Sequence, residues 1–440
     1  MCHRQIFLSH EKSGGTACMG RRASETSGID NRGASNYRCR TMKNLWILFV
    51  CVVLACPFSL QAATLQAGPT RKYKTPCAAI AAAHDGDVVL IDSGTYTGDV
   101  CAFQQNDLTV RGVSATNRPV INANHTAADK LGTWVSRGRN FTVENVEMEG
   151  SWKPQSIGGN GAALRELGKN WTVRNCYLHD NQNGILEGNV VGSKILIEYS
   201  EFARNGVAHG ESSGYTHNLY VGTAGELTFR FNYSHDAIVG HLLKTRAAVN
   251  YILYNRLSGQ NGTDSYEADI PEGGTTYFIG NIVQQGKNSQ NPAMLSYMEE
   301  GWRRQYNPGG DLYVIDNTFV NQLGRPAPFI NVGKDDTTPV VVQNNILYGG
   351  GKVITQKNAK LISNFSDDPK FVNVNGFDYR LRPGSPVIGA ATHPGSSPEG
   401  YSLVPADQYV QPACGETRQN AKDIGALAYR NKGSGLNCRP

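Results

Sequence analysis

Short apolar segments, each followed by a polar turn, recur along the middle of the chain at intervals of 24 to 36 residues. Each holds about three to five residues rich in valine, isoleucine and phenylalanine, which is typical of a β-strand. A strand this short cannot bury its own face, so each copy is stable only when the next copy covers it. Taking one apolar residue per copy as equivalent gives Val110, Val143, Val173, Ile197, Phe229, Leu253, Ile279, Ile315 and Val342.

Asparagine often follows these strands, as at Asn145, Asn175 and Asn255. It tolerates tight turns, and its amide can hydrogen-bond the asparagine one coil above. A β-sandwich or a propeller also uses many short strands, but few Asn-Gly or Asp-Gly turns separate paired strands here. We therefore predict an all-β protein, a single-stranded right-handed parallel β-helix (a solenoid) with a short N-terminal capping helix.

The two ends of this repeat region carry recognisable cap sequences. Residues 76–83 are an alanine-rich helical stretch, which the Asp-Gly-Asp at 85–87 ends. A helix over the first coil covers an edge that would otherwise pair with other strands. With the Gly-Thr-Tyr turn at 94–96 and the Gly-Ser-Pro at 384–386, these elements resemble the caps of the pectate-lyase-like β-helix superfamily. The resemblance covers roughly residues 72–430 and implies a fold more than a reaction.

Residues 42–62 have a basic start and an apolar run too short to span a bilayer. This is typical of a secretory signal peptide cleaved near Ala62, with a membrane anchor as the alternative. Residues 1–41 lie upstream of a signal that belongs at an N-terminus, so we interpret them as a mis-assigned segment. We expect a β-helix domain at 63–430, a tail at 431–440, and a secreted, periplasmic or extracellular monomer without a stable membrane span.

Removing this leader leaves five of the ten cysteines. Export permits disulfides, and we expect the near neighbours Cys77 with Cys101 and Cys414 with Cys438 to join at the two ends. Cys176 lies in a strand motif, so we expect it to be an ordinary buried thiol. The net charge of +5 includes the leader, so it says little about partners. The sequence contains no nucleic-acid, zinc or nucleotide-binding motif.

Ionisable and aromatic residues gather on the segments that precede the asparagine-bearing strands. These segments are 217–221, 240–246, 265–270 and 294–300. Stacked strands lie about 4.8 Å apart, so side chains on one outer face of several coils converge. Alternation along a strand predicts that Asn218 and Tyr220, and likewise Glu267 and Asp269, point outward. The expected substrate-binding residues are His217, Asn218, His235, Tyr266, Glu267, Asp269 and Tyr297.

Such a set suits β-elimination of a uronic-acid-containing polysaccharide. A cation must neutralise the uronate, a base must remove the C5 proton, and an acid must protonate the departing oxygen. We predict Lys244 as the base, with neighbouring positive charge bringing its pKa toward working pH. Arg246 then neutralises the uronate carboxylate, and His241 or Tyr220 serves as the acid. An acidic polysaccharide is the expected partner.

Residues 240–247 with 250–255 are similar to the base-bearing coil of the alginate lyase and chondroitinase B family. In that family a lysine on the strand precedes an asparagine-containing strand, and the resemblance nominates Lys244 as the base. The chain departs from the family at two places. Ile-Val at 238–239 stands where the family has calcium-binding acidic residues, and 266–269 replaces its Arg-His pair.

Other functions fit the same stretch. It also resembles mannuronan C5-epimerases, for which His235 with His241 and Arg246 would serve, although their Asp-Pro-His-Asp signature is missing. A glycoside hydrolase of polygalacturonase type would use a close set of carboxylates, although the Asn-Thr-Asp and Asp-Asp elements of that family are absent. The residues that could supply this set are Glu267, Asp269, Glu272, Glu299 and Glu300. A cell-surface protein that binds glycan without turnover is a further alternative. Glu267 and Asp269 would orient the site or bind a cation, which makes Ca²⁺ a candidate cofactor, with no metal site assigned.

Overall fold

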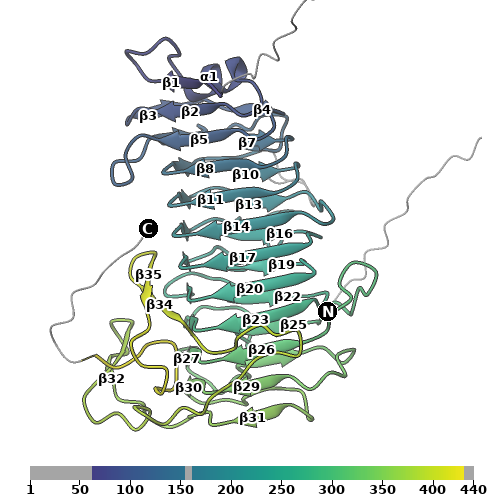
Figure 1. Ribbon diagram of the computed structural model, residues 1–440, viewed down its shortest axis with the longest axis vertical. Coiled ribbons are helices and arrows are strands. Elements are labelled where there is room, and N and C mark those ends of the chain that lie inside the picture. Colours follow the sequence, from purple (N-terminus) through teal and green to yellow (C-terminus); the bar gives the residue numbers. More distant parts are fainter. Residues whose placement is uncertain (1–61, 154–160, 431–440) are drawn as a thin grey trace, which may run out of the picture. The chain divides into compact units, whose positions relative to one another are not determined.

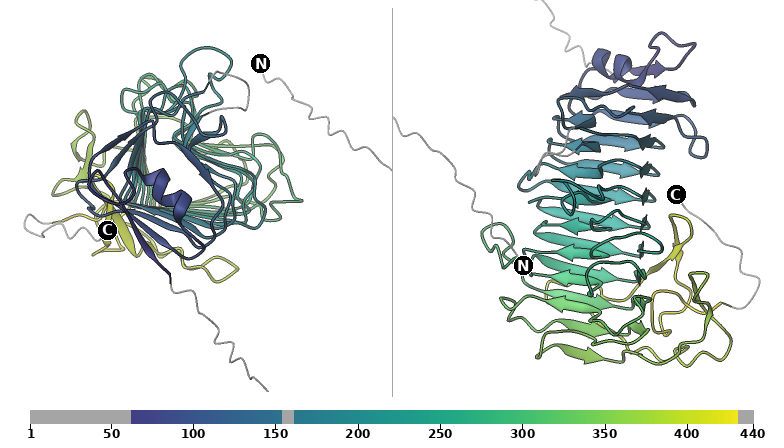
Figure 2. Two further views of the ribbon diagram at one scale, coloured as in Figure 1. Left: turned by 90° about the horizontal axis from the view of Figure 1, so that it is seen from above. Right: turned by 180° about the vertical axis from the view of Figure 1, so that it is seen from behind.

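The fold consists of three parallel sheets wound by one continuous path. A computed structural model describes residues 62–153 and 161–430. The chain passes from sheet A to sheet B to sheet C and returns to sheet A, adding one strand to each, so every circuit forms one coil (Figure 1; Figure 2). This confirms the predicted parallel β-helix. The upstream segment 1–41, the signal peptide up to residue 61 and the tail 431–440 lie outside the described residues.

The strands of each sheet follow one another in chain order. Sheet A contains β1 Thr64–Ala67, β2 Val88–Ile91, β5 Thr109–Gly112, β8 Phe141–Glu144, β11 Trp171–Arg174, β14 Lys194–Glu198, β17 Glu226–Arg230, β20 Val249–Leu253, β23 Thr275–Ile279, β26 Leu312–Ile315, β29 Val341–Gln343 and β31 Lys360–Ile362. Sheet B contains β3 Thr95–Thr97, β6 Val120–Asn122, β9 Glu147–Glu149, β12 Tyr177–His179, β15 Glu201–Ala203, β18 Tyr233–His235, β21 Arg256–Ser258, β24 Ile282–Gln285, β27 Thr318–Asn321 and β30 Ile346–Tyr348. Sheet C contains β4 Cys101–Phe103, β7 Gly132–Ser136, β10 Ala162–Glu166, β13 Asn183–Glu187, β16 Leu219–Val221, β19 Lys244–Thr245, β22 Ala268–Ile270, β25 Leu295–Tyr297 and β28 Ile330–Val332.

The core fills the inside of the coils with stacked apolar side chains. In sheet A, Phe229 pairs with Ile252, not with Leu253 as the sequence series proposed. Leu253 and its successors Ile279 and Ile315 instead face outward, where they join a separate buried cluster. That part of the series was therefore wrong by one residue. Both faces of these strands are apolar, and alternation alone cannot identify the inner one.

A left-handed turn and an asparagine ladder connect sheet A to sheet B. The residue that follows the sheet A strand has positive φ in successive coils, as in Tyr254 at 55° and Gly280 at 67°. The next residue in the later coils is a buried asparagine. Asn281 Oδ1 accepts from the backbone N–H of Asn255 at 2.9 Å, and Asn281 Nδ2 donates to Asn317 Oδ1 at 3.1 Å. The predicted contact between asparagines of neighbouring coils is confirmed.

The N-terminal end of the solenoid carries the helix α1, Pro76–Ala82, which packs against β1, β2 and β4 (Figure 2). Its N-cap Thr75 accepts a hydrogen bond from Ala78 N–H at 3.3 Å. Cys77 in this helix forms a disulfide with Cys101, as predicted. The other expected pair includes Cys438, which lies outside the described residues. Cys176 is a buried free thiol.

After the last coil, the chain folds back against the outside of sheets A and B (Figure 1). This segment contains two antiparallel hairpins, β32 Phe371–Asn373 with β33 Asp378–Leu381, and β34 Asp407–Val410 with β35 Cys414–Thr417. Its contacts explain why the outer face of sheet A is apolar in these coils, since Leu403 packs beside Leu253 and Ile315. Among the helices of the described ranges, none has the length and apolarity to cross a membrane.

Candidate functional site

Sheet C carries an outward row of polar side chains on three successive coils. Tyr220 on β16 pairs in register with Lys244 on β19, and Lys244 pairs with Asp269 on β22. The residue before each member of this row is in the core, so alternation turns the row outward. The strand register therefore places a phenol, an ammonium and a carboxylate about 4.8 Å apart along the solenoid.

Lys244 and Arg246 hold one carboxylate between them. Glu300, which follows β25, accepts from Lys244 Nζ at 3.1 Å and from Arg246 Nη2 at 2.7 Å. The Glu300 side chain is 48% exposed, whereas those of Lys244 and Arg246 are only 10% and 12% exposed. Arg246 also donates to the Tyr220 hydroxyl at 2.7 Å through Nε, and it pairs with Glu272. The two cations thus form a carboxylate-binding fork at the surface.

The charge state of Lys244 differs from the sequence expectation. Burial disfavours the Lys244 ammonium, but the carboxylates of Asp269 and Glu300 outweigh this effect and raise its pKa. The contact with Asp269 Oδ2 is 3.0 Å. The expectation that neighbouring positive charge brings the Lys244 pKa toward neutrality was wrong, because two acidic side chains contributed by later coils face the ammonium. Lys244 is a protonated cation at neutral pH.

His217, His241 and Tyr266 stack beside this row, on the same three coils. The rings of His217 and His241 are 4.7 Å apart, and those of His241 and Tyr266 are 5.3 Å apart. Each histidine accepts a backbone N–H at Nδ1, from His241 and Tyr266 respectively, which leaves the ring proton on Nε2. Burial first, and then the nearby cations, lowers the pKa of both histidines well below its usual value.

These hydrogen bonds define what His241 can do. Its Nε2 faces Asp269 Oδ2 at 3.4 Å, so the neutral ring orients the carboxylate that pairs with Lys244. A neutral imidazole whose Nδ1 is occupied neither takes up a proton readily nor gives one to a leaving group. The geometry therefore favours a positioning role for His241 over the predicted role of general acid.

Three of the expected substrate-binding residues are inside the protein. Asn218 is buried, where its Nδ2 donates to Ser234 Oγ at 3.1 Å. Tyr297 is in the core and donates to the Gly274 carbonyl at 2.9 Å. Glu267 is also fully buried, near Ser289 Oγ at 3.5 Å. The expectation of outward side chains at Asn218 and Glu267 was wrong, because both precede the sheet C strands, where the strand alternation has not yet begun.

Glu267 and Asp269 do not share a cation site. Burial, and then the nearby Asp264, raise the pKa of Glu267 well above its usual value, which disfavours its charged form. Asp269 faces Lys244 instead. Across residues 62–153 and 161–430, no group of three or more histidine, cysteine, aspartate or glutamate side chains is placed to hold a metal ion.

Glu272 and Glu300 were named only as candidate carboxylates of the hydrolase alternative, and Arg303 was not predicted. Glu272 accepts from Arg303 Nη1 at 3.0 Å and also pairs with Arg246. Glu272 lies two residues beyond β22, and Glu300 three residues beyond β25. The signal available in the sequence was a carboxylate just past consecutive sheet C strands. Whether such a carboxylate reaches the site depends on the strand register, which the sequence does not determine.

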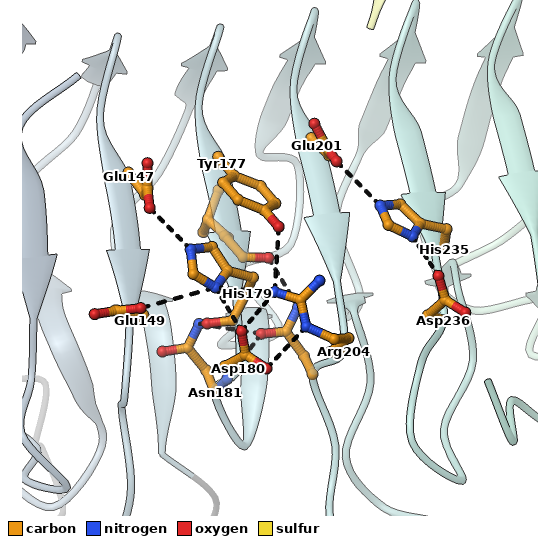
Figure 3. Close-up of polar contacts among 12 residues, drawn as sticks. Glu147, Glu149, Tyr177, His179, Asp180, Asn181, Glu201, Arg204, His235 and Asp236 are labelled. Atoms are coloured by element: carbon orange, nitrogen blue, oxygen red, sulfur yellow. Dashed lines mark hydrogen bonds and ion pairs between the residues drawn. The ribbon is translucent and has the colours of Figure 1, made fainter. Parts of the chain in front are cut away.

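His235 belongs to a different face of the molecule, on sheet B (Figure 3). Its Nδ1 contacts Asp236 at 2.6 Å, and its Nε2 contacts Glu201 at 3.1 Å. It therefore does not join Arg246 and His241, as the epimerase alternative required. Both of its ring nitrogens contact carboxylates, which suits an ion-paired imidazolium and leaves no free nitrogen for proton transfer.

The same arrangement occurs two coils earlier, at His179 (Figure 3). His179 contacts Asp180 at 2.6 Å and Glu147 at 3.1 Å, and Arg204 pairs with Asp180. A tyrosine two residues before each histidine stacks on its ring, as Tyr177 does at 4.0 Å. The repeated Tyr-x-His-Asp sequence was the unrecognised signal of this pair of ion networks.

These networks predict that stability falls at alkaline pH. Burial disfavours the protonated rings of His179 and His235, but hydrogen bonds to their carboxylates outweigh it and raise both pKa values. A raised histidine pKa stabilises the fold below the unfolded value of about 6.5, and the contribution is lost as pH rises through the folded pKa. We expect the H179Q/H235Q variant to lose about 2 °C or more of Tm at pH 6, and less at pH 9.

Thermal unfolding of the wild-type and H179Q/H235Q proteins from pH 6 to pH 9 measures the difference between their Tm values. Taking this difference removes the effects of other titrating groups. His217 and His241 have lowered pKa values, so their contribution changes on the acidic side, as pH falls below about 6.5. A Tm difference that stays the same from pH 6 to pH 9 would show that the imidazolium charge does not stabilise the protein.

Comparison with known proteins agrees with this architecture. No family model and no curated protein sequence matches the chain. Among solved structures, pectate lyase Pel9A is similar, with a TM-score of 0.59 and 15% identity over 84% of this chain and 97% of that chain. The chain has the parallel β-helix fold of pectate lyase. The resemblance predicted from the cap sequences is thus confirmed for the fold.

Two other structures match with lower TM-scores. An alginate lyase from Paenibacillus sp. has a TM-score of 0.42 and 13% identity, over 70% of this chain and 99% of that chain. The A-module of a mannuronan C-5 epimerase from Azotobacter vinelandii has a TM-score of 0.40 and 15% identity, over 66% of this chain and 94% of that chain.

Proposed function

We propose that this protein is a secreted polysaccharide lyase that cleaves an acidic, uronic-acid-containing polysaccharide by β-elimination. The observation that carries the proposal is the Glu300 carboxylate held between Lys244 and Arg246. A half-exposed carboxylate on two largely buried cations occupies the place that a uronate carboxylate would take. The Cys77–Cys101 disulfide supports an extracytoplasmic location.

In the proposed reaction, Lys244 and Arg246 bind the uronate carboxylate in place of Glu300. This neutralisation stabilises the negative charge that develops when the C5–H bond breaks. The proton acceptor is the Tyr220 oxygen in its deprotonated, phenolate form, since this oxygen faces solvent and already accepts a hydrogen bond from Arg246. The C4–O bond then breaks, a C4=C5 double bond forms, and Tyr220 returns the proton to the departing oxygen.

The carboxylates of the site support a lyase over a glycoside hydrolase. A hydrolase needs one carboxyl group protonated at working pH. Burial tends to protonate Glu300, but the charges of Lys244 and Arg246 outweigh burial and lower its pKa. Asp269 and Glu272 are each paired with a cation as well. The site thus keeps its exposed acid ionised.

The direct test is the ultraviolet absorbance of the unsaturated uronate product. Mature protein would be incubated with alginate, pectate, glycosaminoglycans and bacterial exopolysaccharides, and products separated by chromatography. We expect absorbance to rise with one of these polymers and to be lost in Tyr220→Phe, while the control Tyr251→Phe on sheet A stays active. Saturated products would indicate a hydrolase, and binding without products a glycan-binding protein.

The variant Glu300→Gln separates two roles of Glu300. If its carboxylate only competes with the substrate, then removing the charge frees the fork, and we expect KM for the acidic polymer to fall about 10-fold. Glu299→Gln is a matched control, since Glu299 is the exposed neighbouring acid. Loss of kcat in Glu300→Gln would instead show that Glu300 takes part in the chemistry.

A further inference from the structure

Arg165 continues the outward row of the candidate site toward the N-terminal end. It pairs in register with Leu186, which pairs with Tyr220, the first member of the row described above. Arg165 therefore lies three strands before Lys244, which is about 14 Å along the sheet. Its neighbour on β7 is Val135, so the row extends over both sides of Arg165.

Among the described residues, Arg165 lacks the ion-pair partners that Arg246 and Arg303 have. Its side chain is half-buried, it donates no hydrogen bond and forms no ion pair within the described residues, and its Nε is buried without an acceptor. The Glu187 charge acts on it, but that carboxylate accepts backbone N–H groups from Asn189, Val190 and Gly222. A partly buried guanidinium without an acceptor is unfavourable unless a ligand supplies one.

Other cations lie close to Arg165. Burial lowers the pKa of Lys153, and the charges of Lys130 and Arg165 lower it further, so Lys153 lies within reach of both charges. Neither lysine forms an ion pair with a described residue. Trp152, next to Lys153, is 37% exposed, and an exposed indole can stack on a sugar ring.

We propose that Arg165, Lys153 and Lys130 form a second carboxylate-binding subsite for the same polysaccharide chain. The inference rests on the proposed function and adds that the substrate is a long, extended chain. Two cationic sites about 14 Å apart on one row require an extended polyanion that lies across the coils of sheet C, because a single uronate cannot reach both. The protein would thus act on long acidic chains and use Arg165 to hold them.

Steady-state kinetics on a long polymer and on its trisaccharide tests this. Arg165→Ala is expected to raise KM for the polymer about 10-fold at low salt, with kcat within about twofold. The trisaccharide is too short to reach both sites, so its kinetics stay unchanged. Arg165→Lys keeps the charge and retains most of the affinity. Arg380→Ala is the control, since Arg380 is exposed and pairs locally with Asp378.

Electrophoresis through gels that contain the polyuronate or a neutral glucan separates this inference from the proposed function. If no unsaturated product forms on any polymer, but the polyuronate retards the protein and Arg165→Ala does not bind it, the subsite stands and the lyase does not. Equal KM values and equal retardation for wild type and Arg165→Ala would overturn the subsite. Equal retardation by the neutral glucan would also overturn it. Unchanged Tm verifies folding, as Arg165 Nε has no hydrogen-bond partner among the described residues.

Discussion

Replacing Lys244 with methionine is expected to lower kcat/KM on the acidic polymer by about 10³-fold, because half of the carboxylate-binding fork is lost. The measurement is the initial rate of absorbance increase from the unsaturated product. The substitution also leaves Asp269, which is 5% exposed, without its cation. A cost of about 3 kcal/mol in stability therefore accompanies the loss of activity.

A double variant separates the two effects of this substitution. Lys244→Met with Asp269→Asn removes both charges of the buried pair, so we expect it to recover most of the lost stability. Activity should stay low, since the cation that binds the uronate is still absent. Recovery of activity together with stability would show that Lys244 acts through folding alone and would remove it from the proposed mechanism.

Asn281→Ala is expected to lower the free energy of unfolding by about 3 to 5 kcal/mol. The amide accepts the backbone N–H and the Nδ2 of Asn255, and it donates to the Ile252 carbonyl at 2.8 Å. Its removal leaves these buried groups unsatisfied, at a cost of about 1 to 3 kcal/mol each. Urea denaturation measures the change, and thermal unfolding should show a Tm lower by about 5 °C.

The exposed asparagine Asn358 provides the control for this prediction, since its amide donates only to the Thr337 carbonyl at 3.3 Å. Asn358→Ala should change stability by less than about 0.5 kcal/mol. If Asn281→Ala were as mild, the interior asparagine ladder would contribute little to holding the coils together, and the turns would depend on apolar packing instead.

The β-helix could be predicted from the sequence because its signal is repeated in every coil. The register was predicted correctly where only one face of the strand is apolar, as at Val143 and Val173. It was wrong at Leu253, where the C-terminal segment covers the outer face and makes both sides apolar. That segment is distant in sequence, so no local pattern could report its contact.

The candidate site shows the same limit. The outward positions of Tyr220 and Lys244 follow from alternation along single strands. The charge state of Lys244 does not, because Glu300 is 56 residues away in sequence. The sequence also did not show which sheet carries His235, because each coil has three short strands and the residue could lie on any of them.

The strand register along sheet C fixes the spacing of the site residues along the solenoid. Arg165, Tyr220, Lys244 and Asp269 occupy one row, so the distances between them are set in whole steps of about 4.8 Å. Loops between the sheets can change length without altering these steps. Gaining or losing an entire coil between Arg165 and Lys244 would instead shift the two cationic positions by one full step, and so select a polymer with a different spacing of charge.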